Sequence, residues 1–110
     1  MKKFIILAVG ATVSFNVFAS EVFTVPTDSK ASYTVLEKTR SGDMATITTK
    51  REGPSGMSYS KRLYDCKAST VKYLGSGDTI KQMNNSAADP NMAPIIDRSI
   101  AYYVGQKACR

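Results

Sequence analysis

The most reactive side chains of this 110-residue chain are its two cysteines, Cys66 in the middle and Cys109 at the penultimate position. A nucleophilic or redox-active thiol needs a neighbouring base or a second thiol at C-x-x-C spacing. The chain contains no histidine, and its two cysteines are far apart in the sequence. These patterns disfavour a catalytic thiol and favour a disulfide bridge.

The carboxylates do not form a pattern that acid-base chemistry requires. Asp65, next to Cys66, has two interpretations: a strand-end residue that accepts hydrogen bonds, or a ligand residue. The segment GSGDT, residues 75–79, lacks the lysine and the following helix of a phosphate-binding loop, so an ordinary turn is expected there. We therefore expect no enzymatic activity, no cofactor and no metal site. The scattered carboxylates, most of them in expected turns, are Glu21, Asp28, Glu37, Asp43, Glu52, Asp65, Asp78, Asp89 and Asp97.

Basic side chains give the clearest indication of binding. Lys50 and Arg51 end one expected strand, and Lys61 and Arg62 lie midway along the next, so the four are candidates for one basic patch. Such a patch attracts sulfated glycans, lipopolysaccharide phosphates or acidic protein surfaces. The alternative is that adjacent strand residues point to opposite faces, so that each pair contributes one member. Tyr102, outside the apolar stripe of the expected C-terminal helix, is a further candidate for contact with a partner.

The N-terminal segment MKKFIILAVGATVSFNVFAS has the pattern of a secretory signal peptide. Two lysines precede an apolar run, and small residues occupy the cleavage positions, so we expect removal of residues 1–19. The apolar run of about ten residues is shorter than the roughly 20 needed to span a bilayer. We therefore expect an exported protein, in the periplasm or at the cell surface, with no membrane span.

Export would lower the net charge of the mature chain and place its cysteines in an oxidising compartment. Without Lys2 and Lys3, 13 of the 15 basic residues remain against 9 acidic ones, a net charge of +4. With this modest charge and no interleaved aromatic motif, we do not expect a nucleic-acid partner. Small domains in oxidising compartments commonly rely on disulfides, which predicts a Cys66–Cys109 bridge.

Most of the chain before Cys66 has the composition of β-strands. Residues 33–40 and 44–51 predict a hairpin around the turn at 41–43, and the turn signal EGPSG, residues 52–56, leads to a third strand at 57–66. Residues 70–74 predict a fourth strand that the glycines of 75–78 break. Residues 79–83 suggest a further strand, and residues 84–94 suggest a loop.

The C-terminal segment changes to helical spacing. From Ile96 the apolar residues recur at intervals of three and four, and Asp97 or Ser99 is available as an N-cap. Gly105 weakens such a helix by roughly 1 kcal/mol relative to alanine, so packing must hold it in place. We predict an α+β domain over residues 20–110: a small antiparallel sheet with this helix on one face, stapled by one disulfide. The apolar stripe consists of Ile96, Ile100, Tyr103, Val104 and Ala108.

Two segments carry a resemblance to a known family. YSKRLYDCKASTVKYL, followed by PIIDRSIAYYVGQKAC, resembles the surface-adhesin protein E-like family of small exported bacterial proteins. The matching features are Tyr64-Asp65-Cys66 at the end of a long strand and the segment that leads from Pro94 to Cys109. The resemblance implies an antiparallel sheet with a helix on one face, a bridge, and, weakly, the binding of host extracellular proteins.

Three functions are compatible with these observations. The first is a non-enzymatic, adhesin-like interaction module that binds a protein or an anionic surface ligand. The second is a periplasmic inhibitor of a host hydrolase such as lysozyme, and the third is an accessory component of an envelope complex. We expect a host extracellular or envelope protein as the partner, and an edge-strand homodimer is compatible with all three.

Overall fold

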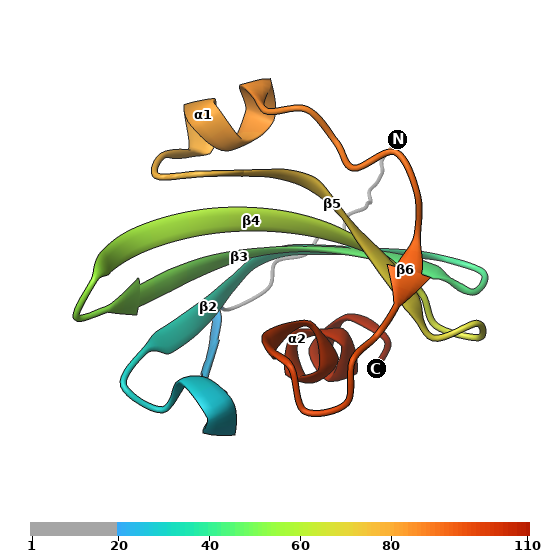
Figure 1. Cartoon of the computed structure of the whole chain (residues 1–110), viewed down its shortest axis with the longest axis horizontal. Helices are drawn as coiled ribbons and strands as arrows, with labels where there is room; N and C mark the ends of the chain where they lie inside the picture. Colours follow the sequence, from blue (N-terminus) through green and yellow to red (C-terminus); the bar gives the residue numbers. More distant parts are fainter. Residues whose placement is uncertain (1–19) are drawn as a thin grey trace, which may run out of the picture.

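The structure is a computed structural model that describes residues 20–110 (Figure 1). The predicted signal peptide, residues 1–19, lies outside the described residues. Six antiparallel strands follow one another across a single sheet in the order β1 to β6. The strands are β1 (Glu21–Phe23), β2 (Ser32–Ser41), β3 (Met44–Gly53), β4 (Gly56–Asp65), β5 (Thr70–Gly77) and β6 (Ala93–Pro94).

Two tight turns connect the long strands. Ser41 pairs with Met44 and Gly53 pairs with Gly56, so each connection has two residues. Gly42 and Gly56 have φ values of +60° and +115°, which a residue with a side chain adopts at a cost. The predicted strands at 33–40, 44–51 and 57–66 are confirmed, and so is the antiparallel sheet.

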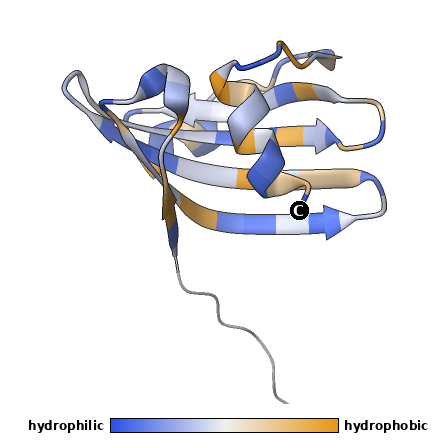
Figure 2. Ribbon diagram, turned by 90° about the horizontal axis from the view of Figure 1, so that it is seen from below, coloured by the Kyte–Doolittle hydropathy of each residue, from blue (hydrophilic) through white to orange (hydrophobic). Residues whose placement is uncertain are grey.

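Three helical segments complete the fold. They are the 3₁₀ turn η2 (Pro26–Asp28), α1 (Ile80–Asn85) and α2 (Ile100–Ala108). Figure 1 shows α1 and α2 on opposite faces of the sheet. Helix α2 has nine residues, so it covers only part of its face (Figure 2).

The strand predicted at residues 79–83 is wrong, because α1 forms there. The Thr79 hydroxyl accepts a hydrogen bond from the Gln82 backbone N–H and caps the helix. The predicted strand break at 75–78 is also wrong, since β5 continues to Gly77. The reason is the close approach of α1: a Cβ on Gly77 would lie 2.6 Å from the Gln82 Cβ, and one on Gly75 would collide with the Met83 carbonyl oxygen.

Helix α2 begins four residues later than the apolar stripe predicts. The Ser99 hydroxyl accepts from the Tyr102 N–H, which makes Ser99 the N-cap, and Ile96 is 70% exposed in the preceding segment. Val104 and Ala108 belong to the main apolar cluster, together with Val35 and Ile47 from the sheet. The helix therefore buries its stripe from Ile100 onward only.

Tyr64 connects α2 to the centre of the sheet. Its side chain is fully buried, and its hydroxyl donates a 2.6 Å hydrogen bond to the Ala101 carbonyl oxygen. Burial raises the pKa of Tyr64, so its hydroxyl keeps its proton at neutral pH. A Cβ on Gly105 would lie only 2.6 Å from the Tyr64 ring. Gly105 is thus the residue that lets the helix approach the sheet.

A three-residue cluster holds η2 against the same face. Arg51 donates from Nε and Nη2 to the two carboxylate oxygens of Asp28, at 2.7 and 3.0 Å. The Tyr33 hydroxyl donates to Asp28 Oδ2 at 2.5 Å. These bonds, from Arg51 foremost and then Tyr33, lower the pKa of Asp28 from 3.8 to about 2. Burial, followed by the hydrogen bond to Asp28, raises the pKa of Tyr33 to about 12.

We expect Asp28→Asn to lower the free energy of unfolding at pH 7 by about 1 to 2 kcal/mol, because Arg51 loses its counter-ion. The pKa of Asp28 is lower in the folded than in the unfolded chain. The cluster therefore stabilises the fold above about pH 4, and this contribution disappears as the pH falls to about 2. Urea denaturation at several pH values tests this. Between pH 4 and 2 the free energy of unfolding should fall less in the variant than in the wild type. An equal fall in both would show that the ionised Asp28 does not stabilise the fold.

Candidate functional site

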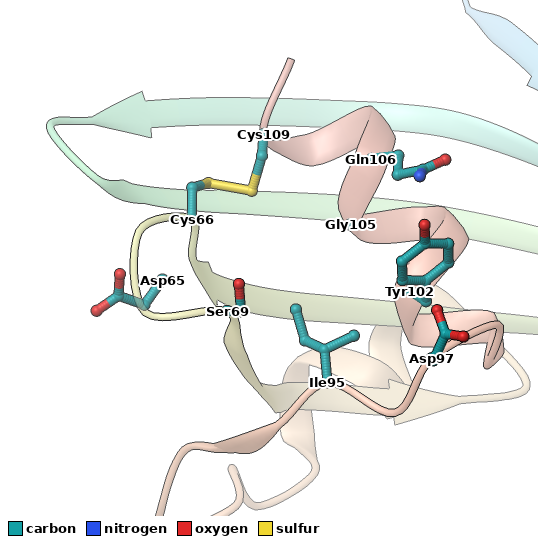
Figure 3. A pocket seen from close by; sticks show the side chains of 9 residues that line it. All are labelled: Asp65, Cys66, Ser69, Ile95, Asp97, Tyr102, Gly105, Gln106 and Cys109. Atoms are coloured by element: carbon teal, nitrogen blue, oxygen red, sulfur yellow. A yellow bond between two sulfur atoms is a disulfide. The ribbon is translucent and has the colours of Figure 1, made fainter.

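A pocket of about 340 Å³ opens beside the disulfide, between α2, the segment that precedes it and the turn after β4 (Figure 3). This volume is at the lower end of the range for small-ligand sites and suits one side chain or a small molecule. The residues that line it are Asp65, Cys66, Ser69, Ile95, Asp97, Tyr102, Gly105, Gln106 and Cys109.

The disulfide forms one wall of the pocket. The bridge between Cys66 and Cys109 confirms the predicted pairing. The Cys66 N–H donates to the Asp43 carbonyl at 2.7 Å, and the Cys109 N–H donates to the Gly105 carbonyl at 2.9 Å. Arg40 Nη1 also donates to the Cys109 carbonyl, at 3.0 Å. This wall is therefore held by a covalent bond and by backbone contacts on both sides.

The β4–β5 turn and the segment after β6 form the opposite wall. Asp65 Oδ1 accepts from the Lys67 and Ala68 N–H groups, at 3.1 and 2.9 Å, and so fixes the turn. The Ile95 N–H donates to the Ser69 carbonyl at 3.1 Å, which attaches the segment after β6 to this turn. Asp65 is thus a strand-end residue that accepts backbone hydrogen bonds, one of its two predicted roles.

Unusual backbone conformations occur on this side of the molecule. Among residues 20–110, the non-glycine residues with positive φ are Ser69, at 57°, and Arg98, at 60°. Ser69 lines the pocket, and Arg98 directly follows Asp97, which also lines it. Sparsely populated backbone conformations of this kind gather at binding sites. Contacts hold both: the Ser69 carbonyl accepts from the Ile95 N–H at 3.1 Å, and the Arg98 carbonyl accepts from the Thr27 hydroxyl at 3.0 Å.

The charge of the pocket is opposite to that of the chain. Lysine and arginine outnumber acidic residues 15 to 9, yet the pocket is lined by two aspartates and by no basic side chain. Asp97 approaches Arg98 at 3.7 Å, but both side chains are 76% exposed, so solvent weakens this pair. Asp97 therefore presents negative charge beside apolar walls formed by Ile95, the disulfide and the Tyr102 ring (Figure 3). The Asp65 carboxylate points away from these walls and binds the backbone of the β4–β5 turn.

Such walls suit an elongated cation with an aliphatic stem. A lysine or arginine side chain buries its methylene groups against apolar surface and keeps its charged end near carboxylates. An aromatic ring adds cation–π attraction when the cation lies over its face. Tyr102 packs edge-on against Tyr103, with ring centroids 5.1 Å apart, which orients its ring. Tyr102, chosen from the sequence as a candidate contact, thus lies at the pocket and is partly buried.

The four basic candidates do not form one patch, so the first of the two alternatives considered for them is wrong. The β3–β4 register pairs Thr48 with Lys61 and Lys50 with Tyr59, which puts the two lysines on one face as diagonal neighbours. Arg51 and Arg62 lie on the other face, because adjacent residues of a strand alternate. Lys50 also approaches Glu52, at 3.8 Å.

The two arginines have different environments on the face that α2 covers. Arg51 forms the ion pair with Asp28, and Arg62 is 4% exposed. Neither is a free surface cation. The alternative from the sequence, in which each pair contributes one member, matches the placement of Lys50 and Lys61.

The sequence did not reveal most of the pocket. Ser69 and Ile95 have no local pattern that marks a site, and Asp97 was considered only as a helix cap and as one of the scattered carboxylates. The available signals were Asp65 beside Cys66 and Tyr102 outside the apolar stripe of the helix. The pocket exists because the disulfide brings the two ends of the Cys66–Cys109 segment together, which local patterns do not report.

Comparison of the chain with protein-family models, curated proteins and solved structures finds no match. The resemblance to the protein E-like family and the homodimer therefore stay predictions. Within residues 20–110, no helix has the length and apolar character required to cross a bilayer. The same residues contain no group of three or more His, Cys, Asp or Glu side chains placed to hold a metal ion.

Proposed function

We propose that this protein is an exported, non-enzymatic interaction module whose pocket receives a lysine or arginine side chain of a partner protein. The observation that carries the proposal is the pocket itself, with Asp97 on its rim and the disulfide and Tyr102 in its walls. The disulfide is consistent with a non-reducing compartment, as expected for a periplasmic or surface protein.

The α+β architecture supports a binding role because it keeps the walls of the pocket in place. The sheet and the Cys66–Cys109 bridge hold the pocket walls, so a partner side chain would enter a site that needs little ordering. The protein E-like, adhesin-type function is one form of this proposal. A hydrolase inhibitor or an envelope accessory would use the same pocket for a basic side chain, and the identity of the partner distinguishes the three.

Site-specific photo-crosslinking tests the proposal. A crosslinking amino acid at Gln106, which is exposed on the pocket rim, should capture a defined partner from host extracellular matrix or from the cell envelope. The control position is Lys81, which is exposed on α1 at the opposite face of the sheet. N-acetyl-arginine methylamide should compete with capture at Gln106. Equal capture of the same proteins at both positions would refute the proposed site.

We expect Asp97→Asn to weaken partner binding by roughly twofold to fivefold, as for a partly exposed ion pair. Asp78→Asn, a matched charge change at another exposed aspartate, should leave binding unchanged. The measurement is the dissociation constant of the crosslinked partner at two salt concentrations. If both variants weaken binding equally, general electrostatics rather than the pocket is responsible.

A further inference from the structure

Arg62 is a buried cation in neutral surroundings. It lies in the middle of β4, 4% exposed, on the face that α2 covers. The sheet register places Ile47 on one side of it and Tyr73 on the other. Within residues 20–110 it has no ion-pair partner at 4 Å or less. A charge removed from water costs several kcal/mol unless an opposite charge and hydrogen bonds compensate it.

The contacts of Arg62 compensate this cost only in part. Nη2 donates to the Tyr73 hydroxyl at 3.0 Å, and Nη1 approaches the Thr49 hydroxyl at 3.5 Å. The guanidinium carbon lies 4.8 Å from the centroid of the Tyr73 ring, a cation–π contact. Nε is buried and has no acceptor among the described residues. The edge of the guanidinium formed by Nε and Nη2 therefore holds one neutral hydroxyl where it could bind two oxygens.

Arg51, on the same face of the sheet, binds a carboxylate through the Nε and Nη2 edge of its guanidinium. Its Nε and Nη2 donate to the two oxygens of Asp28, and the Tyr33 hydroxyl donates to the same carboxylate. Two parallel N–H groups match a carboxylate in this geometry. Arg62 and Tyr73 correspond to the arginine and the tyrosine of this cluster. No carboxylate of residues 20–110 takes the place that Asp28 has beside Arg51.

Tyr73 is an exposed neighbour of the buried Arg62. Its side chain is 41% exposed, and it contacts the guanidinium through its hydroxyl and its ring. Its backbone is fixed by Asp89, whose N–H donates to the Tyr73 carbonyl at 2.9 Å and whose Oδ2 accepts from the Tyr73 N–H at 3.1 Å. The β4–β5 register shifts just beyond it, between Lys61 and Arg62, and such bulges often occur next to binding sites. Access of a ligand to Arg62 requires movement of the side chains that bury it, and a rotation of the Tyr73 phenol would leave these backbone hydrogen bonds in place.

We propose that Arg62 and Tyr73 bind a carboxylate of an acidic segment in a partner polypeptide. The carboxylate accepts from Nε and Nη2 of Arg62 and from the hydroxyl of Tyr73, as Asp28 accepts from Arg51 and Tyr33. This site is separate from the acidic pocket, whose lining does not include Arg62 or Tyr73. Its ligand has the opposite charge, so each site is testable when the other fails.

The test is an NMR titration of the full mature protein with N-acetyl-aspartate methylamide, which carries one carboxylate. We expect a saturable shift of the Arg62 Nε–H resonance, and no shift with the matched asparagine compound. Tyr73→Phe should weaken this binding about threefold to tenfold, because one donor to the carboxylate is lost. Absence of a saturable shift, an equal shift with the asparagine compound, or equal binding of inorganic phosphate would overturn the proposal.

Melting experiments give a second measurement. We expect Arg62→Met to melt at or above the wild-type temperature, since an apolar side chain avoids the cost of the buried charge. The aspartate compound should raise the melting temperature of the wild type but not of Arg62→Met. Lys61→Met is the matched control, with the same charge change on the other face, and should keep the response. A response retained by Arg62→Met, or lost equally in Lys61→Met, would contradict the site.

Discussion

Reduction of the Cys66–Cys109 disulfide is expected to lower the melting temperature of the mature protein by about 10 °C or more. The bridge joins residues 43 positions apart, and the chain-entropy relation assigns a loop of this length roughly 4 kcal/mol. Measured bridges often contribute less, so we expect a loss of about 2 to 4 kcal/mol. Each kcal/mol corresponds to about 4 to 8 °C in a domain of this size.

The loss should begin at the C-terminal end of α2. Cys109, the C-cap of α2, is covalently bonded to Cys66 in the turn after β4, and two other contacts at this end are exposed hydrogen bonds. Lys38 Nζ donates to the Lys107 carbonyl at 2.8 Å, and Arg40 donates to the Cys109 carbonyl. Lys107 Nζ also donates to Glu21 Oε2 at 2.5 Å, in a partly exposed ion pair. These contacts alone resist fraying weakly, because solvent competes for them. The pocket loses a wall in the same event, so the proposed partner binding should fall together with stability.

The measurement is thermal unfolding of the wild type with and without reductant, and of a Cys66→Ala/Cys109→Ala variant. The variant should have the same melting temperature as the reduced wild type. Equal temperatures would show that free thiols do not cause the loss. Amide hydrogen exchange should show lost protection in α2 before β3 and β4. Equal melting temperatures under oxidising and reducing conditions would show that the bridge does not stabilise the fold.

Substitution Gly105→Ala is expected to lower the free energy of unfolding by about 1 to 3 kcal/mol. The sign is the opposite of the intrinsic helix preference, which favours alanine over glycine by roughly 1 kcal/mol. A Cβ at this position would lie 2.6 Å from Tyr64 Cε2, and the buried ring is fixed by its hydrogen bond to the Ala101 carbonyl. The ring cannot move without the loss of that bond or a shift of α2.

Two further variants separate packing from helix propensity. Gln106→Ala, at the next and exposed position of α2, should change stability by less than about 0.5 kcal/mol. Tyr64→Leu removes the ring, and in that background Gly105→Ala should cost less than in the wild type, a coupling that a double-mutant cycle measures. Stabilisation by Gly105→Ala in the wild type would refute the contact.

The long strands and their turns were predictable because residues next to one another in the sequence determine them. Glycines at the turns and β-branched residues between them determine the hairpins of β2, β3 and β4. The disulfide was predictable for a different reason, since an expected exported chain with two cysteines has only one intramolecular pairing.

The errors arose where tertiary contacts override local preference. Gly75 and Gly77 have the composition of a turn, but β5 includes them because α1 packs too close for side chains. Residues 79–83 are short enough to suit either a strand or a helix, and the Thr79 cap together with the burial of Met83 selects the helix. Ile96 continues the helical spacing and yet is exposed, since Ser99 caps α2 after it.

The sequence by itself determined the hairpins, the bridge and the residues from which binding sites could be made. The tertiary structure alone decided which of those residues meet. Strand alternation separated Lys61 from Arg62 and buried the latter beside Tyr73, and the disulfide enclosed a pocket between segments distant in the chain. Side-chain arrangements of this kind depend on register and on long-range closure, which no local preference encodes.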